Sequence, residues 1–199
     1  MPRKSFPTLT LPILALPTLA LTALLLWPQP GRAANFSFQG TLAEPNAVQL
    51  FEFSLSADTT VTLITLGYAG GVNAAGSVVP NGGFDPMLAL FDGAGTLLAQ
   101  DDDGSSVPDP DTVMSLDAFL QALLAPGSYT VALTALANYA VGPALRNGFA
   151  GNGNFDGRSA AWAFDVLGAD SATLPEPAAL ALFGAGLAGL GLARRRRGF

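Results

Sequence analysis

The sequence contains no cysteine and no histidine among its 199 residues. A disulfide scaffold is therefore excluded, and so are zinc sites built on thiolates or imidazoles. Nucleophilic catalysis by a serine–histidine or cysteine–histidine pair is excluded for the same reason. Half of the residues are apolar and only 12% are charged. Function must therefore be sought in carboxylates, backbone groups and apolar segments.

Positive charge is scarce between the two ends of the chain. Arg146 and Arg158 are the only basic residues from Ala34 to Leu174, whereas fourteen of the fifteen acidic residues lie there. This middle segment therefore has a formal net charge of −12, compared with −6 for the whole chain. So acidic a segment repels nucleic acid and anionic lipid, and we expect neither as a partner. It would attract a divalent cation.

Residues 1–34 are typical of a secretory signal peptide. A basic start and an apolar run precede small residues at the −3 and −1 positions of a cleavage site, with cleavage one residue later as an alternative. The residues concerned are Arg3 and Lys4, Leu9 to Trp27, and Gly31-Arg32-Ala33. An uncleaved N-terminal membrane anchor is the other interpretation, but the apolar run is short for a span. We therefore expect a signal helix that is removed on export.

The C-terminal end has three parts in a fixed order. Pro175, Glu176 and Pro177 come first, then an apolar segment at residues 178–193, then Arg194, Arg195, Arg196 and Arg197. A helix of this length spans about 24 Å, a little less than the hydrocarbon core of a bilayer. Arginines after an apolar segment hold that end on the cytoplasmic side. We therefore predict a transmembrane-like helix with a basic stop, which anchors the chain in the cytoplasmic membrane.

This tail resembles the PEP-CTERM sorting signal of Gram-negative bacteria, on residues 175–197. The resemblance implies processing by an exosortase, a membrane-embedded transpeptidase-like enzyme, followed by transfer to the cell envelope, the outer surface or the extracellular matrix. Such proteins are often found in strains that make exopolysaccharide. A plain C-terminal membrane anchor is the alternative. The Gram-positive sortase signal fits less well, because it would need Thr-Gly where this chain has Pro177-Ala178.

Short alternating runs of apolar residues, separated by glycine and proline, predict an all-β domain between the two ends. Asp92-Gly93-Ala94-Gly95 stands between two such runs and predicts a hairpin turn. The spacing of the runs favours an antiparallel sandwich or jelly roll. The runs lie at residues 51–55, 61–66, 87–91, 96–99, 129–133 and 162–166.

Residues 116–124 do not follow this pattern, because their leucines and phenylalanine have helical spacing. A second resemblance favours a strand there instead. The segments that carry it are Gly82 to Asp92, Gly95 to Leu98, Asp101 to Gly104, Leu120 to Leu124 and Pro126 to Tyr129. On these segments the chain resembles the bacterial pre-peptidase C-terminal domains, as they occur in a PEP-CTERM-associated family. That resemblance implies a jelly-roll β-sandwich over residues 35–170, which serves as a non-catalytic accessory or surface module, with a linker and the sorting signal in residues 171–199.

Five aspartates form the candidate metal site: Asp85, Asp92, Asp101, Asp102 and Asp103. Loops rich in Asp and Gly supply the six to eight oxygens that Ca²⁺ requires, and a cation relieves the repulsion between adjacent carboxylates. We therefore consider a structural Ca²⁺ site. The spacing is not that of an EF-hand. The alternative is a solvated acidic loop that protects a sheet edge.

We expect no catalysis, since consecutive carboxylates are poorly placed to flank a glycosidic bond. Residues 147–157 predict a long loop, in which Phe149 and Phe155 either pin the loop to the core or contact a polysaccharide. Trp162 is expected in the core. Two hypotheses follow for function. The first is a non-enzymatic surface or matrix protein, and the second is a Ca²⁺-dependent module that binds exopolysaccharide or acts in adhesion.

Overall fold

The computed structural model describes residues 33–175, and this part of the chain is built from antiparallel strands. Its one helical segment is a 3₁₀ turn, η2 (Leu145–Asn147). The all-β prediction is therefore confirmed. The predicted signal helix and the predicted helix at residues 178–193 lie outside the described residues. Within residues 33–175 no helix is long and apolar enough to cross a membrane.

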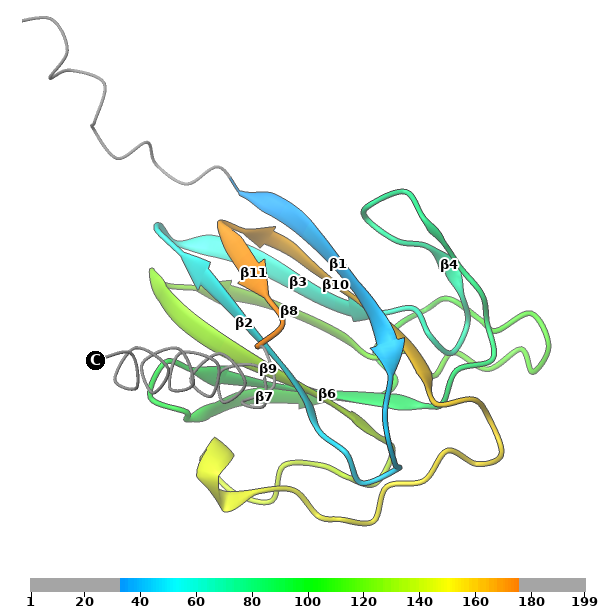
Figure 1. The fold of residues 1–199 in the computed structure, drawn as a ribbon. Helices are drawn as coiled ribbons and strands as arrows, with labels where there is room; N and C mark the ends of the chain where they lie inside the picture. Colours follow the sequence, from blue (N-terminus) through cyan, green and yellow to red (C-terminus); the bar gives the residue numbers. More distant parts are fainter. Residues whose placement is uncertain (1–32, 176–199) are drawn as a thin grey trace, which may run out of the picture. The chain divides into compact units, whose positions relative to one another are not determined.

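Two sheets and one small hairpin contain all of the strands (Figure 1). Sheet A has the order β1–β10–β3–β8, and its strands are Ala34–Thr41, Ala161–Ala169, Thr59–Thr65 and Phe119–Leu124. Sheet B has the order β11–β2–β9–β6–β7, and its strands are Ser171–Thr173, Gln49–Leu55, Gly127–Ala135, Pro86–Asp92 and Leu97–Asp101. The hairpin pairs β4 (Gly71–Val72) with β5 (Val78–Val79).

The chain crosses from one sheet to the other at almost every connection. Within sheets A and B of the described part, only β6 and β7 follow each other in the same sheet, where they form a hairpin. The other strands alternate, so β1 pairs with β10 and β2 pairs with β9. Eight strands connected in this way form a jelly roll, and β11 adds a ninth strand at one edge of sheet B.

Aromatic side chains fill the space between the two sheets. Phe51 and Phe53 of β2 point inward and are buried, whereas Glu52 between them is exposed, as expected for a strand with one face on the core. Phe51 is fully buried against three rings of sheet A, and its centroid distances to Phe38, Phe164 and Trp162 are 5.2, 4.7 and 5.4 Å. The prediction of a core position for Trp162 is confirmed.

The segment with helical spacing is a strand, as the second resemblance implied. Strand β8 covers residues 119–124 and pairs with β3. Alternate residues face inward, and Leu124 is buried while Leu123 is 75% exposed. The helical spacing was misleading because β8 is an edge strand that carries apolar residues on its outer face as well.

The domain continues beyond the predicted boundary at residue 170. Residues 171–173, predicted as the start of a linker, form β11 on the edge of sheet B. Ala172 packs against the core, and the hydroxyls of Ser171 and Ser54 are 2.8 Å apart in a hydrogen bond. The folded strand therefore ends at Thr173, with one residue, Leu174, between it and Pro175.

The contact between Gly40 and Trp162 gives a test of the core. Gly40 lies opposite Trp162 in the β1–β10 ladder, and a Cβ at position 40 would lie 2.5 Å from Cζ2 of the indole. We expect Gly40→Val to lower the free energy of unfolding by about 1–3 kcal/mol, because the core must move to admit it. Urea unfolding of the exported protein measures the change.

Gln39→Val is the matched control for this test, since Gln39 is exposed on the same strand. It should change the stability by less than about 0.5 kcal/mol. Equal unfolding midpoints for the two variants would contradict the close packing of Trp162 on Gly40.

Candidate functional site

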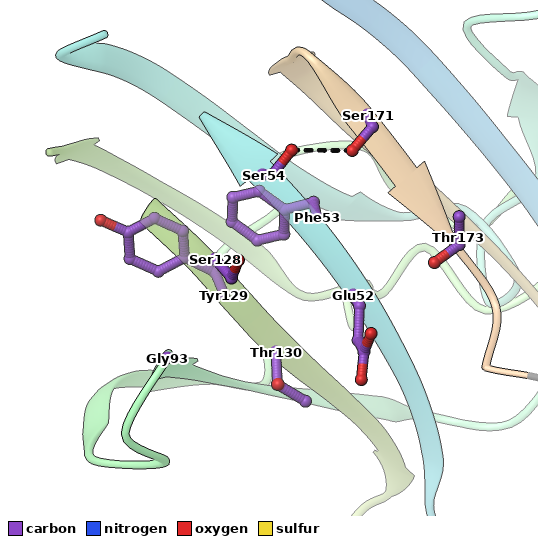
Figure 2. Close-up of a pocket in the computed structure, with 9 residues that line it drawn as sticks. All are labelled: Glu52, Phe53, Ser54, Gly93, Ser128, Tyr129, Thr130, Ser171 and Thr173. Carbon is purple, nitrogen blue, oxygen red and sulfur yellow. Dashed lines mark hydrogen bonds between the residues drawn. The ribbon is translucent and has the colours of Figure 1, made fainter. Parts of the chain in front are cut away.

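A groove runs along the outer face of sheet B where the chain leaves the domain (Figure 2). It has a volume of about 340 Å³ and is open to solvent. Three neighbouring strands, β11, β2 and β9, form its floor, and the β6–β7 turn contributes one residue. Its lining residues are Glu52, Phe53, Ser54, Gly93, Ser128, Tyr129, Thr130, Ser171 and Thr173.

The groove presents five hydroxyls and one carboxylate. Strand alternation explains this composition, because Glu52 and Ser54 lie between the buried positions of β2. Phe53 and Tyr129 stack on each other at a centroid distance of 5.1 Å, but both rings are buried. The Tyr129 hydroxyl donates to the Ala125 carbonyl. The groove therefore offers hydrogen-bonding groups to an extended polar segment and no exposed aromatic platform.

Asp92, one of the predicted metal ligands, closes the hairpin turn. Its Oδ1 accepts hydrogen bonds from the backbone N–H groups of Thr96 (2.8 Å) and Ala94 (2.9 Å). The hydrogen bond from Thr96 is the main reason that the pKa of Asp92 lies below its usual value. The Gly95 N–H also donates to the Asp92 carbonyl, so the predicted turn at residues 92–95 is confirmed.

Asp101 lies at the opposite end of the same hairpin. It pairs with Leu88, four residues before Asp92, which places the two aspartates about 13 Å apart along the strand. Oδ2 of Asp101 accepts hydrogen bonds from the N–H groups of Gly104 and Phe119, both at 2.8 Å. This carboxylate therefore ties the acidic loop to β8.

Asp85 is the one predicted ligand with an unsatisfied buried oxygen. It is only 9% exposed, and its Oδ1 has no hydrogen-bond partner. Burial, followed by the charges of Asp103 and Asp102, raises its pKa to about 7. Burial and the charges of Asp102 and Asp101 also raise the pKa of Asp103. The charges of Asp102 and Asp103 are therefore close enough to Asp85 to raise its pKa.

The five carboxylates predicted as one Ca²⁺ site are not gathered together. Asp92 is at the far end of the hairpin, and Asp101 is engaged by backbone amides. Among residues 33–175, no group of three or more acidic side chains is arranged to hold a metal ion. Asp92 and Asp101 are instead engaged by backbone amides, whereas Asp85, just before β6, keeps a buried oxygen without a hydrogen-bond partner.

Sequence reasoning missed a buried ion pair between Arg158 and Asp109. The guanidinium donates to Oδ2 of Asp109 and to the carbonyls of Gly83 (2.6 Å) and Tyr68 (2.9 Å), and its Cζ lies 3.7 Å from the centre of the Tyr68 ring. Four segments of the chain therefore meet at one cation. One signal was available, since Arg158 is one of only two basic residues in a segment with fourteen acidic ones.

Asp109 is fully buried at the centre of its own loop. Burial by itself would raise the pKa of this carboxyl, but hydrogen bonds from Arg158 and from the N–H groups of Asp111 and Thr112 lower it to about 2. The carboxylate is therefore charged at every pH above this value. It organises the loop and is not free to act as an acid or a base.

The two phenylalanines of the predicted long loop pin it to the domain. Phe155 packs against the main core, and its ring lies 5.0 Å from that of Phe84. Phe149 packs against a second apolar cluster that contains Phe91. Neither ring forms an exposed platform for a sugar.

Residues 173–197 match the family model of the PEP-CTERM protein-sorting motif. The chain therefore carries this sorting signal, which marks an exported, envelope-associated protein for exosortase-dependent sorting. The match begins at the last residue of β11 and does not reach the rest of the domain. The resemblance of the domain to the pre-peptidase modules stays a prediction. No curated protein matches the chain.

The raised pKa of Asp85 predicts an unusual pH dependence of stability. The folded protein holds this proton up to about pH 7, whereas an unfolded aspartate releases it near pH 3.8. The contribution to stability is therefore complete below pH 3.8 and is lost as the pH rises to about 7. We expect Asp85→Asn to remove this loss and to stabilise the protein at pH 8, by on the order of 4 kcal/mol.

Thermal unfolding of wild type and Asp85→Asn between pH 4 and pH 8 measures the difference. Asp58→Asn removes the same charge at an exposed position and should change little at any pH. If the two variants follow the same pH profile, the burial of an unsatisfied carboxyl at position 85 is refuted.

Proposed function

We propose that this protein is a non-enzymatic surface or extracellular-matrix protein of a Gram-negative bacterium, delivered by exosortase processing of its tail. One observation carries the proposal: the sorting motif follows directly on the last strand of an acidic jelly-roll domain. Export through the predicted signal peptide (residues 1–34) and transient anchoring by the predicted helix at residues 178–193 complete the route. The domain would then be the cargo that reaches the envelope or the medium.

The chemistry of the described residues supports a role without catalysis. The groove beside β11 has hydroxyls and one carboxylate, and a chain without histidine or cysteine has neither of the usual bases and nucleophiles to activate them. Asp101, Asp109 and Asp117 accept hydrogen bonds from backbone amides, so their carboxylates serve the fold. A domain with a formal net charge of −12 also remains soluble and repels anionic surfaces.

Replacing Pro175-Glu176-Pro177 by alanines tests the sorting route. We expect the variant to keep its tail, because the enzyme no longer recognises the motif, and to stay in the membrane fraction. Mass spectrometry and fractionation in a host with an exosortase measure both effects. Arg146→Ala changes an exposed residue of the domain outside the motif and is the control. Normal processing of the alanine variant would contradict the sorting role and leave the tail as a plain membrane anchor.

A second candidate function is Ca²⁺-dependent binding of exopolysaccharide or adhesion. One observation favours it: the unsatisfied Oδ1 of Asp85 lies near the charges of Asp102 and Asp103, and a cation would relieve their repulsion. The loop would have to rearrange to bring these groups onto one ion. Hydroxyls of the groove beside β11 would be available for sugar hydrogen bonds.

Calorimetry of the processed protein with Ca²⁺, and then with the host polysaccharide, tests this second function. We expect Ca²⁺ to raise the unfolding temperature at pH 8 in wild type and not in Asp102→Asn/Asp103→Asn, where two oxygen ligands have lost their charge. Mg²⁺ at the same concentration controls for general screening. Absence of heat and of stabilisation with both ligands would exclude the function.

A further inference from the structure

Strand β11 is held to the domain by a small set of contacts at the edge of sheet B. Within residues 33–175 its three residues pair with β2 alone: Ser171 with Ser54, Ala172 with Phe53, and Thr173 with Glu52. The side-chain contribution is one hydrogen bond between the hydroxyls of Ser54 and Ser171, and the half-buried Ala172 is its single contact with the core. Short edge strands of this kind open at a lower free energy than the core.

Residues just before β11 add two further attachments. The Asp170 N–H donates to the Ser54 carbonyl at 3.0 Å, and the Asp170 carboxylate accepts from the Ser56 N–H. Both partners belong to the end of β2 and the turn after it. The chain is therefore fastened before β11, so that the strand can detach while the domain remains closed.

The boundary between β11 and the sorting motif is fixed by proline. Leu174 is the only residue between the strand and Pro175. Proline has no N–H to donate to a ladder, so the pairing with β2 cannot continue through Pro175 and Pro177. No flexible spacer separates the folded sheet from the motif.

An enzyme that cuts near the motif must bind the chain on both sides of the cut. Extended peptides bind through their backbone N–H and C=O groups, as an added strand does. On the N-terminal side of the motif, β2 already occupies the backbone groups along one edge of residues 171–173, whereas the other edge is open. An enzyme cleft that encloses the peptide needs both edges, so it cannot hold this segment while β2 is paired with it.

We infer that β11 is a docking strand that controls access to the sorting motif: it must leave β2 before the tail is processed. The inference rests on the proposed function, since it assigns a regulator to the same processing reaction. The rate of processing then follows the fraction of molecules in which β11 is detached. The domain itself thereby sets how fast its own tail is cut.

A disulfide across the docked strand tests this directly. Ser54 and Ser171 lie opposite each other with hydroxyls 2.8 Å apart, which suits a disulfide between Ser54→Cys and Ser171→Cys. The chain has no other cysteine, and export places the pair in an oxidising compartment. Pulse–chase labelling in an exosortase-bearing host, with and without reductant, follows the loss of the tail.

We expect the oxidised double variant to be processed at least about tenfold more slowly than Ser171→Cys alone, because the covalent link keeps β11 on β2, and we expect reductant to restore the rate. The single variant has the same tail sequence and is therefore the matched control. Ser54→Ala releases the strand without touching the tail. It should speed processing about fivefold, the change in population that a lost hydrogen bond of about 1 kcal/mol produces.

The outcomes separate this inference from the proposed function. Equal processing rates in the oxidised, reduced and Ser54→Ala proteins would overturn the control by β11 and leave exosortase sorting intact. A wild-type tail that is never cut, in hosts with and without the enzyme, would overturn both. Slow processing in the locked protein together with faster processing in Ser54→Ala supports the inference, because a misfolded variant would not be rescued by reductant.

Discussion

The two sheets are held together by the contact of Phe51 with three aromatic rings of the opposite sheet. No disulfide exists to fasten them, so the sandwich depends on dispersion and on the removal of these rings from water. Gly40 belongs to the same arrangement, since the indole of Trp162 occupies the space where any other residue would place its side chain. Because the core is apolar, the charged residues lie on the outer faces of the sheets, as Glu52 does, and in the loops.

Local patterns in the sequence were sufficient for most of the sheet. The alternation at residues 51–55 and the turn at Asp92 to Gly95 depend on near neighbours, and both are found as predicted. Strand β8 needed the family resemblance, because its exposed Leu123 gives the segment a helical spacing. Strand β11 could not be predicted from its own three residues. It forms because its residues pair with the edge of β2, where Ser54 lies 117 positions before Ser171 in the chain.

The candidate functional residues also fall into a part that the sequence predicts and a part that it does not. The sorting motif is a local sequence and was recognisable in full, whereas the roles of the aspartates depend on partners distant in the chain. Asp109 is paired with Arg158, 49 positions later, and Asp101 with the N–H of Phe119, 18 positions later. Nothing in an Asp-rich segment distinguishes such carboxylates from metal ligands. Asp85 and Asp109 are both buried, yet their pKa values move in opposite directions, because only Asp109 has a cation beside it.

The pairing of β1 with β10 has a consequence for the order of events in the cell. Among residues 33–175, β1 is the first strand, and its one partner, β10, begins 120 residues after β1 ends, at Ala161. Sheet A therefore cannot close on the ribosome until nearly the whole domain has been made, and non-local strand pairing of this kind is slow. A chain that stays unfolded for so long suits the export that its sorting motif implies. Sheet A can close only once β10 is available, and β10 is made just before the tail.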